Sequence, residues 1–295
     1  MSHPSTLEPK TDLTGKVAVI TGVASDVGLA LALHAADRGM KVALCDENEY
    51  LLAAALEKVR MKDVGAIAIP SNRFDSPTFC ELARHTAAEL GPPWLVCNNP
   101  GVNIEVTLWG LINGVQVFTA GMVERDQGHI VNIAAAEVFG TRGAATDAAI
   151  THAIVGLSES LYRELDSRGS QVGVTLVCPA LGTTSIASSA ECLDSALSTR
   201  GHAALNSLSP EEVAKQIFSA VDTRSFWFRP LTSELGEMSG PGRSARAWPD
   251  SAAKSQIRPH KPSSAARGGR SVSSRGNIDI KLGNVGDTTK PAAGL

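Results

Sequence analysis

Tyrosine and lysine are scarce in this chain of 295 residues. Only two tyrosines occur, Tyr50 and Tyr162, and neither is followed by a lysine four residues later. No lysine at all lies between Lys62 and Lys215. The sequence therefore lacks a helical Tyr-x-x-x-Lys pair, in which the lysine lowers the pKa of a tyrosine that transfers a proton.

Paired cysteines and long apolar runs are also missing. The five cysteines contain no C-x-x-C pair, which argues against a zinc site or a disulfide framework: Cys45, Cys80, Cys97, Cys178 and Cys192. No apolar run approaches the ~20 residues that span a bilayer. The polar residues 1–13 do not resemble a signal peptide. We expect a cytoplasmic protein with reduced thiols, no bound metal and no membrane span.

Charge is distributed unevenly along the chain. Residues 231–295 hold 10 Lys/Arg against 5 Asp/Glu, whereas residues 1–230 hold 17 against 25. The tail is rich in Gly, Ser, Pro and Ala and has little apolar periodicity, so we expect residues 231–295 to be disordered. Its basic residues are not interleaved with aromatic ones, so we do not expect nucleic acid as a partner. Recruitment of some other anionic partner by the tail is one alternative function.

Short apolar runs alternate with helical patterns through residues 14–230, after an N-terminal tail of residues 1–13. Seven strands are expected at 16–21, 41–45, 66–69, 94–97, 129–133, 172–178 and 225–228. Helices are expected up to 38 and at 50–60, 77–90, 107–124, 144–168 and 209–221, the last capped by Ser209. This order predicts an α/β domain with a doubly wound parallel sheet. Residues 182–208 interrupt the alternation and are the expected substrate lid.

A glycine-bearing turn follows the first expected strand. It reads Thr21-Gly22-Val23-Ala24-Ser25-Asp26-Val27-Gly28 and opens a helix. Backbone N–H groups at a helix N-terminus bind phosphate well, and missing side chains let the backbone approach a pyrophosphate. The turn therefore predicts a dinucleotide site.

This turn resembles the TGxxxGxG motif of the short-chain dehydrogenase/reductase family. Further segments are similar in family order: Asn98–Gly101 to NNAG, Gly128–Ile133 to the fifth strand, Gly156–Leu165 to the fifth helix, and Cys178–Pro179 to CPG. The resemblance covers roughly residues 14–229. It implies a Rossmann-type fold, a nicotinamide cofactor, oxidoreductase chemistry, and a homodimer or homotetramer formed through the long helices.

The resemblance assigns the cofactor site to Thr21, Gly22, Ser25, Asp26, Val27, Gly28, Asp46, Asn72, Asn99, Gly101 and Thr184. Asp46 follows the second strand, where a carboxylate accepts from ribose hydroxyls and repels a 2′-phosphate, so NAD is preferred over NADP. Asp46 could also cap the next helix. Asp26 replaces the family's middle glycine and either repels the pyrophosphate or turns away as a helix cap. Asn72 and Ala180 are two further departures from the family pattern.

All four catalytic positions implied by the resemblance are substituted. The Asn position falls on Thr107, the Ser position on Ala135 (Ala134 if the loop differs by one residue), the Tyr position on Asp147 and the Lys position on Thr151. An ionised Asp147 has no proton to donate to a carbonyl. These substitutions predict an NAD-binding pseudoenzyme or a strongly impaired oxidoreductase.

An active enzyme is the main alternative. An NAD-dependent alcohol or ketone oxidoreductase could use rearranged acid/base groups, with Asp147 as a base and His152 as the neighbouring group that titrates near neutrality. His152 lies one residue past the Lys position, about 100° around the helix, and a helix position of this kind is more often on the surface.

Overall fold

A computed structural model describes residues 11–71, 75–99, 104–134, 145–178 and 208–228. All of these belong to the first of two compact units, Met1–Pro259, the second being His260–Leu295. The predicted basic tail and nearly all of the predicted lid lie outside the described residues. The domain boundaries at 13/14 and 230/231 therefore stay predictions.

The described residues form alternating strands and helices, in the predicted order. The strands are β1 (Val17–Thr21), β2 (Lys41–Asp46), β3 (Ala66–Pro70), β4 (Pro93–Asn98), β5 (Gly128–Ile133), β6 (Val172–Val177) and β7 (Trp227–Phe228). The helices are α1 (Asp26–Asp37), α2 (Glu49–Arg60), α3 (Ser76–Glu89), α4 (Ile104–Glu124), α5 (Ala145–Ser167) and α6 (Pro210–Asp222). Most ends differ from the predicted ones by one or two residues.

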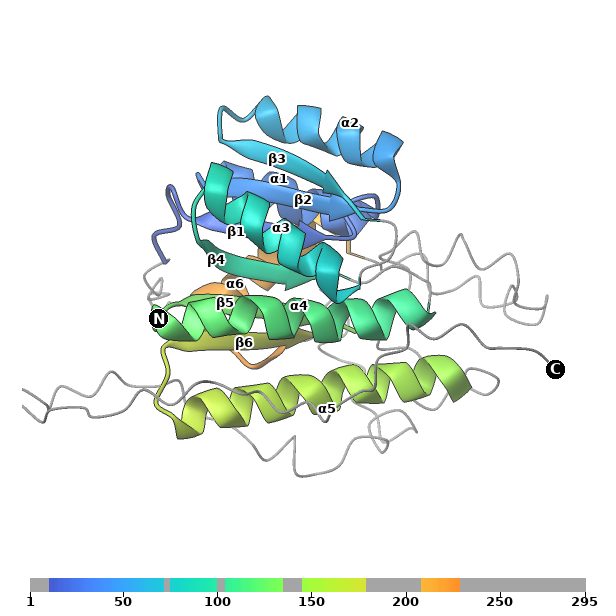
Figure 1. Cartoon of the computed structure of the whole chain (residues 1–295), viewed down its shortest axis with the longest axis vertical. Coiled ribbons are helices and arrows are strands. Elements are labelled where there is room, and N and C mark those ends of the chain that lie inside the picture. The colour runs from blue at the N-terminus through green and yellow to red at the C-terminus, as the bar shows by residue number, and fades with distance from the viewer. Residues whose placement is uncertain (1–10, 72–74, 100–103, 135–144, 179–207, 229–295) are drawn as a thin grey trace, which may run out of the picture. The chain divides into compact units, whose positions relative to one another are not determined.

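The strands form a parallel sheet in the order β3-β2-β1-β4-β5-β6-β7 (Figure 1). The order reverses between β1 and β4, where the chain first builds outward to β3 and then returns to the other side of β1. In open α/β sheets, ligands bind at the carboxyl edge of such a reversal point. The doubly wound fold predicted from the sequence is confirmed, and it brings the turn after β1 next to the loop after β4.

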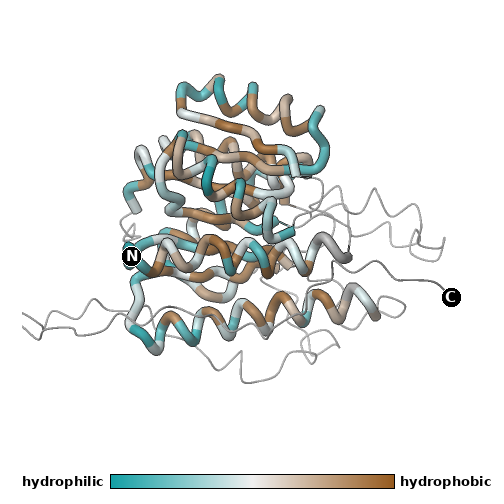
Figure 2. Tube along the Cα trace, viewed as in Figure 1, coloured by the Kyte–Doolittle hydropathy of each residue, from teal (hydrophilic) through white to brown (hydrophobic). Residues whose placement is uncertain are grey.

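Helices cover both faces of the sheet. One apolar cluster joins alternate strand residues to α1, α2 and α6, and a second joins the other strand residues to α3, α4 and α5. Figure 2 shows hydrophobic residues concentrated along the strands and on helix sides next to them. Strands that are buried on both faces explain the continuous apolar runs of the sequence.

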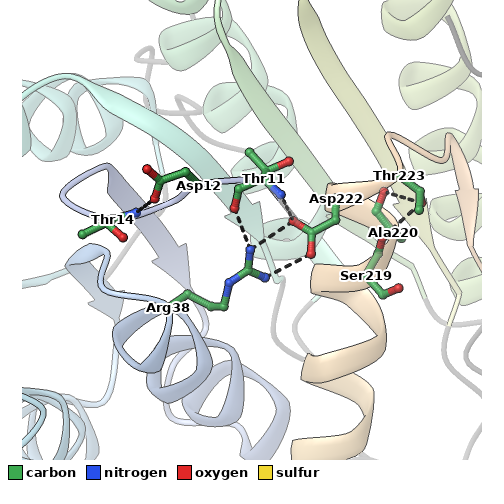
Figure 3. Close-up of polar contacts among 8 residues, drawn as sticks. All are labelled: Thr11, Asp12, Thr14, Arg38, Ser219, Ala220, Asp222 and Thr223. Atoms are coloured by element: carbon green, nitrogen blue, oxygen red, sulfur yellow. Dashed lines mark hydrogen bonds and ion pairs between the residues drawn. The ribbon is translucent and has the colours of Figure 1, made fainter. Parts of the chain in front are cut away.

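An ion pair joins the ends of α1 and α6 (Figure 3). The Arg38 guanidinium donates to both carboxylate oxygens of Asp222 at 3.1 Å, and the two side chains are only 16% and 11% exposed. Arg38 also donates to the Thr11 carbonyl at 2.8 Å, while the Thr11 N–H donates to Asp222 at 3.1 Å. This cluster fastens the segment before β1 to two helices on one face of the sheet.

His129 is a buried histidine near the start of β5. Thr175 Oγ1 donates to the Ser225 carbonyl at 2.7 Å, so its hydrogen is used, and the 2.8 Å contact with His129 Nε2 must have the imidazole as donor. His129 Nδ1 is then a buried acceptor with no hydrogen-bond partner. Burial, with Arg224 nearby, lowers the pKa of His129 to about 3. The ring is therefore neutral at physiological pH.

Within the described part of the chain, no helix is long and apolar enough to cross a membrane.

Candidate functional site

The turn after β1 requires glycine at two positions. Gly22 has φ +66°, and a Cβ there would lie 2.0 Å from the Asn99 carbonyl oxygen. A Cβ on Gly28 would lie 2.0 Å from the Gly22 carbonyl oxygen. Since neither approach allows a side chain, the first and third glycines of the motif are dictated by backbone packing.

Asn99 holds this turn against the loop after β4. Its Nδ2 donates at 2.9 Å both to the Gly22 carbonyl and to Ser25 Oγ. Ser25 Oγ in turn donates to the Gly22 carbonyl at 2.7 Å and accepts from the Gly28 N–H at 3.1 Å. Because these contacts use the hydroxyl hydrogen and both lone pairs of Ser25, the side chain has no capacity left for a phosphate.

The N-terminus of α1 begins with a carboxylate. Ser25 is the N-cap, and Asp26 is the first helical residue and is exposed. The idea that Asp26 caps the helix was therefore wrong; the short Ser25 side chain already reaches Gly28, the third residue of the helix. The N–H groups of Asp26 and Val27 belong to the first helical turn, which has no carbonyl of its own to bond. They are the donors that this turn can offer to an anion.

Asp46 ends β2 beside the turn and is 5% exposed. Its carboxylate accepts from the Ala24 N–H at 2.8 Å and from the Asn48 N–H at 2.9 Å, one bond to each oxygen. The alternative that Asp46 caps the next helix was wrong, because Asn48 is the N-cap of α2 and accepts from the Leu51 N–H. A carboxylate has about four acceptor positions, so Asp46 retains capacity for ribose hydroxyls.

A buried polar chain that sequence reasoning missed lies beside the site. Asn98 Nδ2 donates to Asn132 Oδ1 at 2.9 Å, and Asn132 Nδ2 donates to Ser158 Oγ at 2.9 Å. All three residues are almost fully buried, and Asn98 Oδ1 has no hydrogen-bond partner. The chain links β4 and β5 to α5 and so helps to fix the helix that carries two of the catalytic positions. The sequence signal that could have predicted this chain is the pair Asn98 and Asn132, which lie near the ends of two strands expected to be neighbours.

The described catalytic positions hold hydroxyl groups. Thr151 on α5 is 3% exposed, and Thr107 on α4 is half-buried. Neither can supply the positive charge of a lysine. His152 is exposed, and its Nδ1 lies 2.7 Å from the Ala148 carbonyl, to which it must donate. Its exposure agrees with the surface position expected 100° around the helix from Thr151, and the ring contacts its own helix.

The pKa shifts of three other described groups do not favour proton transfer at neutral pH. Burial, helped by the nearby Asp166, raises the pKa of Tyr162, the opposite of what a catalytic tyrosine needs. Burial raises the pKa of Cys45 and Cys97 to about 12, so both stay neutral thiols. In the described ranges, no group of three or more His, Cys, Asp or Glu side chains could hold a metal ion.

Several predicted site residues lie outside the described residues: Asn72, Gly101, Ala135, Ala180 and Thr184. For Asp147 only the backbone is described, one helical turn before Thr151 in α5. The structure thus brings together Thr21, Gly22, Ser25, Gly28, Asp46 and Asn99 around one turn. The site residues assigned from the sequence remain predictions.

Known proteins resemble this chain in both sequence and structure. SadH of Mycobacterium tuberculosis is 31% identical over 202 residues, covering 61% of this chain and 71% of SadH. The 3-oxoacyl-acyl-carrier-protein reductase FabG of Staphylococcus aureus is 28% identical over 182 residues, covering 56% and 73%.

Solved structures match the fold. A short-chain dehydrogenase/reductase from Burkholderia phymatum, in complex with NAD, has a TM-score of 0.69 and 28% identity and covers 77% of this chain and 92% of its own. The apo form of LigO from a Sphingobium species has a TM-score of 0.65 and 26% identity, covering 77% and 86%. The family model of short chain dehydrogenases matches residues 16–192. This chain therefore belongs to the short-chain dehydrogenase/reductase family and has its oxidoreductase-like, NAD-binding fold.

Proposed function

We propose that this protein binds NAD at the carboxyl edge of β1, β2 and β4 and does not transfer hydride at a useful rate. The proposal rests on the contrast between a cofactor turn with the required glycines and catalytic positions without an acid/base pair. The glycine cradle at Gly22 and Gly28 has the tight packing that a dinucleotide turn needs. The proton-transfer positions Thr107 and Thr151 carry only hydroxyl groups, and the sequence places Ala135 and Asp147 at the other two.

The cofactor fits the residues of the turn. The N–H groups of Asp26 and Val27 would face the pyrophosphate at the start of α1, and Asp46 would accept from the adenosine ribose. The Burkholderia phymatum relative was crystallised with NAD, which supports this assignment. In its reduced form, NADH, the bound cofactor would supply a hydride to a carbonyl, and this chain's residues would hold it without the acid that completes carbonyl reduction.

Loss of the acid/base group explains why we expect no useful turnover. General acid–base catalysis typically contributes roughly 10²–10⁴-fold to a rate. The alternative enzyme with Asp147 and His152 requires His152 to reach the substrate, and its exposed ring instead donates to Ala148 of its own helix. We therefore favour the pseudoenzyme.

NADH should bind at least roughly tenfold more tightly than NADPH, because the Asp46 carboxylate would repel a 2′-phosphate. Calorimetric or fluorescence titration of both cofactors measures the difference. Replacing Asp46 with Asn should reduce the difference in affinity between NADH and NADPH. Equal or tighter binding of NADPH to the wild-type protein would disprove the assignment of Asp46.

Replacing Asp26 with Gly or Asn should tighten NADH binding, by roughly tenfold, because a negative charge at the start of α1 opposes the pyrophosphate. Glu49→Gln is the matched control, since Glu49 is the acidic residue in the first turn of α2. Unchanged affinity in both Asp26 variants would mean that this carboxylate is directed away from the cofactor.

We also propose that the protein forms a homodimer or homotetramer through α4 and α5. The two helices lie next to each other on one face of the sheet, and Trp109 of α4 is 44% exposed. A large aromatic side chain exposed on such a helix is typical of a contact surface.

A further inference from the structure

A pocket of about 200 Å³ lies at the amino edge of the sheet, opposite the cofactor turn. Its lining comes from the start of β1, the start of β4 and the segment between α4 and β5, and includes Lys16, Leu90, Pro92, Trp94, Arg125 and Gln127. Because β1 has five residues, its first and last Cα atoms are separated by roughly 13 Å. The pocket is therefore a separate place on the molecule from the proposed cofactor site.

Two cations line this pocket, and both are held by neutral groups. Lys16 Nζ lies 4.2 Å from the centre of the Trp94 ring, a cation–π contact. Arg125 donates to the Pro93 carbonyl at 2.8 Å. Among the described residues, the ion pairs include neither Lys16 nor Arg125. The adjacent residues Pro93 and Trp94 thus fix two positive charges at one pocket without neutralising them.

Two carboxylates act on these cations at longer range. Asp12 attracts Lys16, and Glu124 attracts Arg125, but both carboxylates are exposed and neither forms an ion pair with its cation. Charges exposed to water are strongly screened. Burial in turn lowers the pKa of both Lys16 and Arg125, as expected for cations that have lost part of their hydration. An anion entering the pocket would meet donors that are already partly desolvated.

The rest of the lining is largely apolar. Apart from the two cations, the lining includes Trp94, Leu90, Val17 and the prolines at 92 and 93. Pockets for drug-sized ligands span roughly 300–1,000 Å³, so this smaller pocket suits a correspondingly smaller molecule. Two cations beside an apolar wall match a carboxylate attached to a short hydrocarbon chain. We propose that the pocket binds a short-chain organic carboxylate, independently of the nicotinamide cofactor.

The test is a calorimetric titration of the full-length protein with butyrate, using butyramide and inorganic phosphate as comparison ligands. Butyrate should bind at least roughly tenfold more tightly than butyramide, because only butyrate has the charge that Lys16 and Arg125 would bind. It should also bind more tightly than phosphate, which gains nothing from the apolar wall. Saturating NADH should leave the affinity for butyrate unchanged.

Two variants locate the binding. Lys16→Gln and Arg125→Gln should each weaken butyrate binding by roughly tenfold, whereas Lys16→Arg should retain most of it. Arg84→Gln, which removes an exposed cation from α3, is the matched control and should change nothing. The melting temperature of each variant shows whether it is folded, and the ligand comparison on wild-type protein needs no variant. The proposal would be overturned by equal binding of butyrate and butyramide, by tighter binding of phosphate than of butyrate, or by competition between NADH and butyrate. It would also be overturned if folded Lys16→Gln protein bound butyrate as tightly as the wild type.

Discussion

Single buried polar residues account for much of what could not be predicted from the sequence. The glycines of the turn and the N-cap Ser209 were predictable, because a known local geometry demands those residue types. The cap roles suggested for Asp26 and Asp46 were wrong. The N-cap of α1 is Ser25, one residue before Asp26, and the N-cap of α2 is Asn48, two residues after Asp46. His129 gave no signal at all, because its environment depends on Thr175 and Gly173 of β6, which is adjacent in the sheet but more than 40 residues away in sequence.

The neutral His129 predicts a pH dependence of stability. Its pKa is about 3 in the folded protein, against about 6.5 for an unperturbed histidine. Between these values the unfolded chain binds a proton that the folded chain excludes. This contribution to the free energy of unfolding is therefore fully present above about pH 6.5 and falls by roughly 1.4 kcal/mol per pH unit below it.

Urea unfolding between pH 5 and pH 7, a window of about two units in which most carboxylates stay ionised, measures this slope. His129→Gln should flatten it, because the amide can still donate to Thr175 but does not titrate. His85→Gln, which alters an exposed histidine of α3, is the control. Parallel slopes for wild type and His129→Gln would mean that another group is responsible.

Secondary structure elements were the most predictable level. Alternation of apolar runs and helical patterns located every described strand and helix, because the central strands are buried on both faces and each helix packs one side against the sheet. The pairing of element ends was not predictable. Arg38 and Asp222 are 184 residues apart in sequence, and only the strand order brings the end of α1 beside the end of α6.

Arg38→Met should lower the free energy of unfolding by about 2 kcal/mol or more, because it leaves the nearly buried Asp222 carboxylate without its charged partner. Chemical denaturation measures the loss. Arg60→Met is the matched control on α2, where the partner Glu57 is 73% exposed and the pair contributes at most about 1 kcal/mol. Equal effects of the two substitutions would show that the Arg38 cluster does not stabilise the fold.

At the scale of the whole molecule, motifs in a fixed order predicted the family and the edge of the sheet where a cofactor would bind. The fold alone does not predict whether the protein catalyses a reaction. One fold can carry many functions, so the sheet and the turn alone do not decide whether the chain is active. In our proposal the difference depends on a few side chains, of which Thr107 and Thr151 are described. Charge asymmetry along the chain separates the acidic part from residues 231–295.

Deleting residues 231–295 should leave the melting temperature within a few degrees of the wild-type value, because a segment without apolar periodicity adds little buried surface. Calorimetry measures this, and light scattering on the same sample compares the molecular mass of the deletion variant with that of the full chain. A large drop in melting temperature, or loss of a proposed oligomer that the full chain forms, would place the tail within the folded structure and move the domain boundary.

The central claim, cofactor binding without turnover, is tested by NADH fluorescence in the presence of a panel of ketones. The signal should change when wild-type protein is added, as NADH binds, and then stay constant when each ketone follows. The combined variant Thr107→Asn, Ala135→Ser, Asp147→Tyr and Thr151→Lys should make the signal decay, and partial sets should do much less, because catalytic residues act as a unit. Steady decay with the wild-type protein that is abolished by Asp147→Ala or His152→Ala would contradict the account and identify an active enzyme with a relocated acid/base pair.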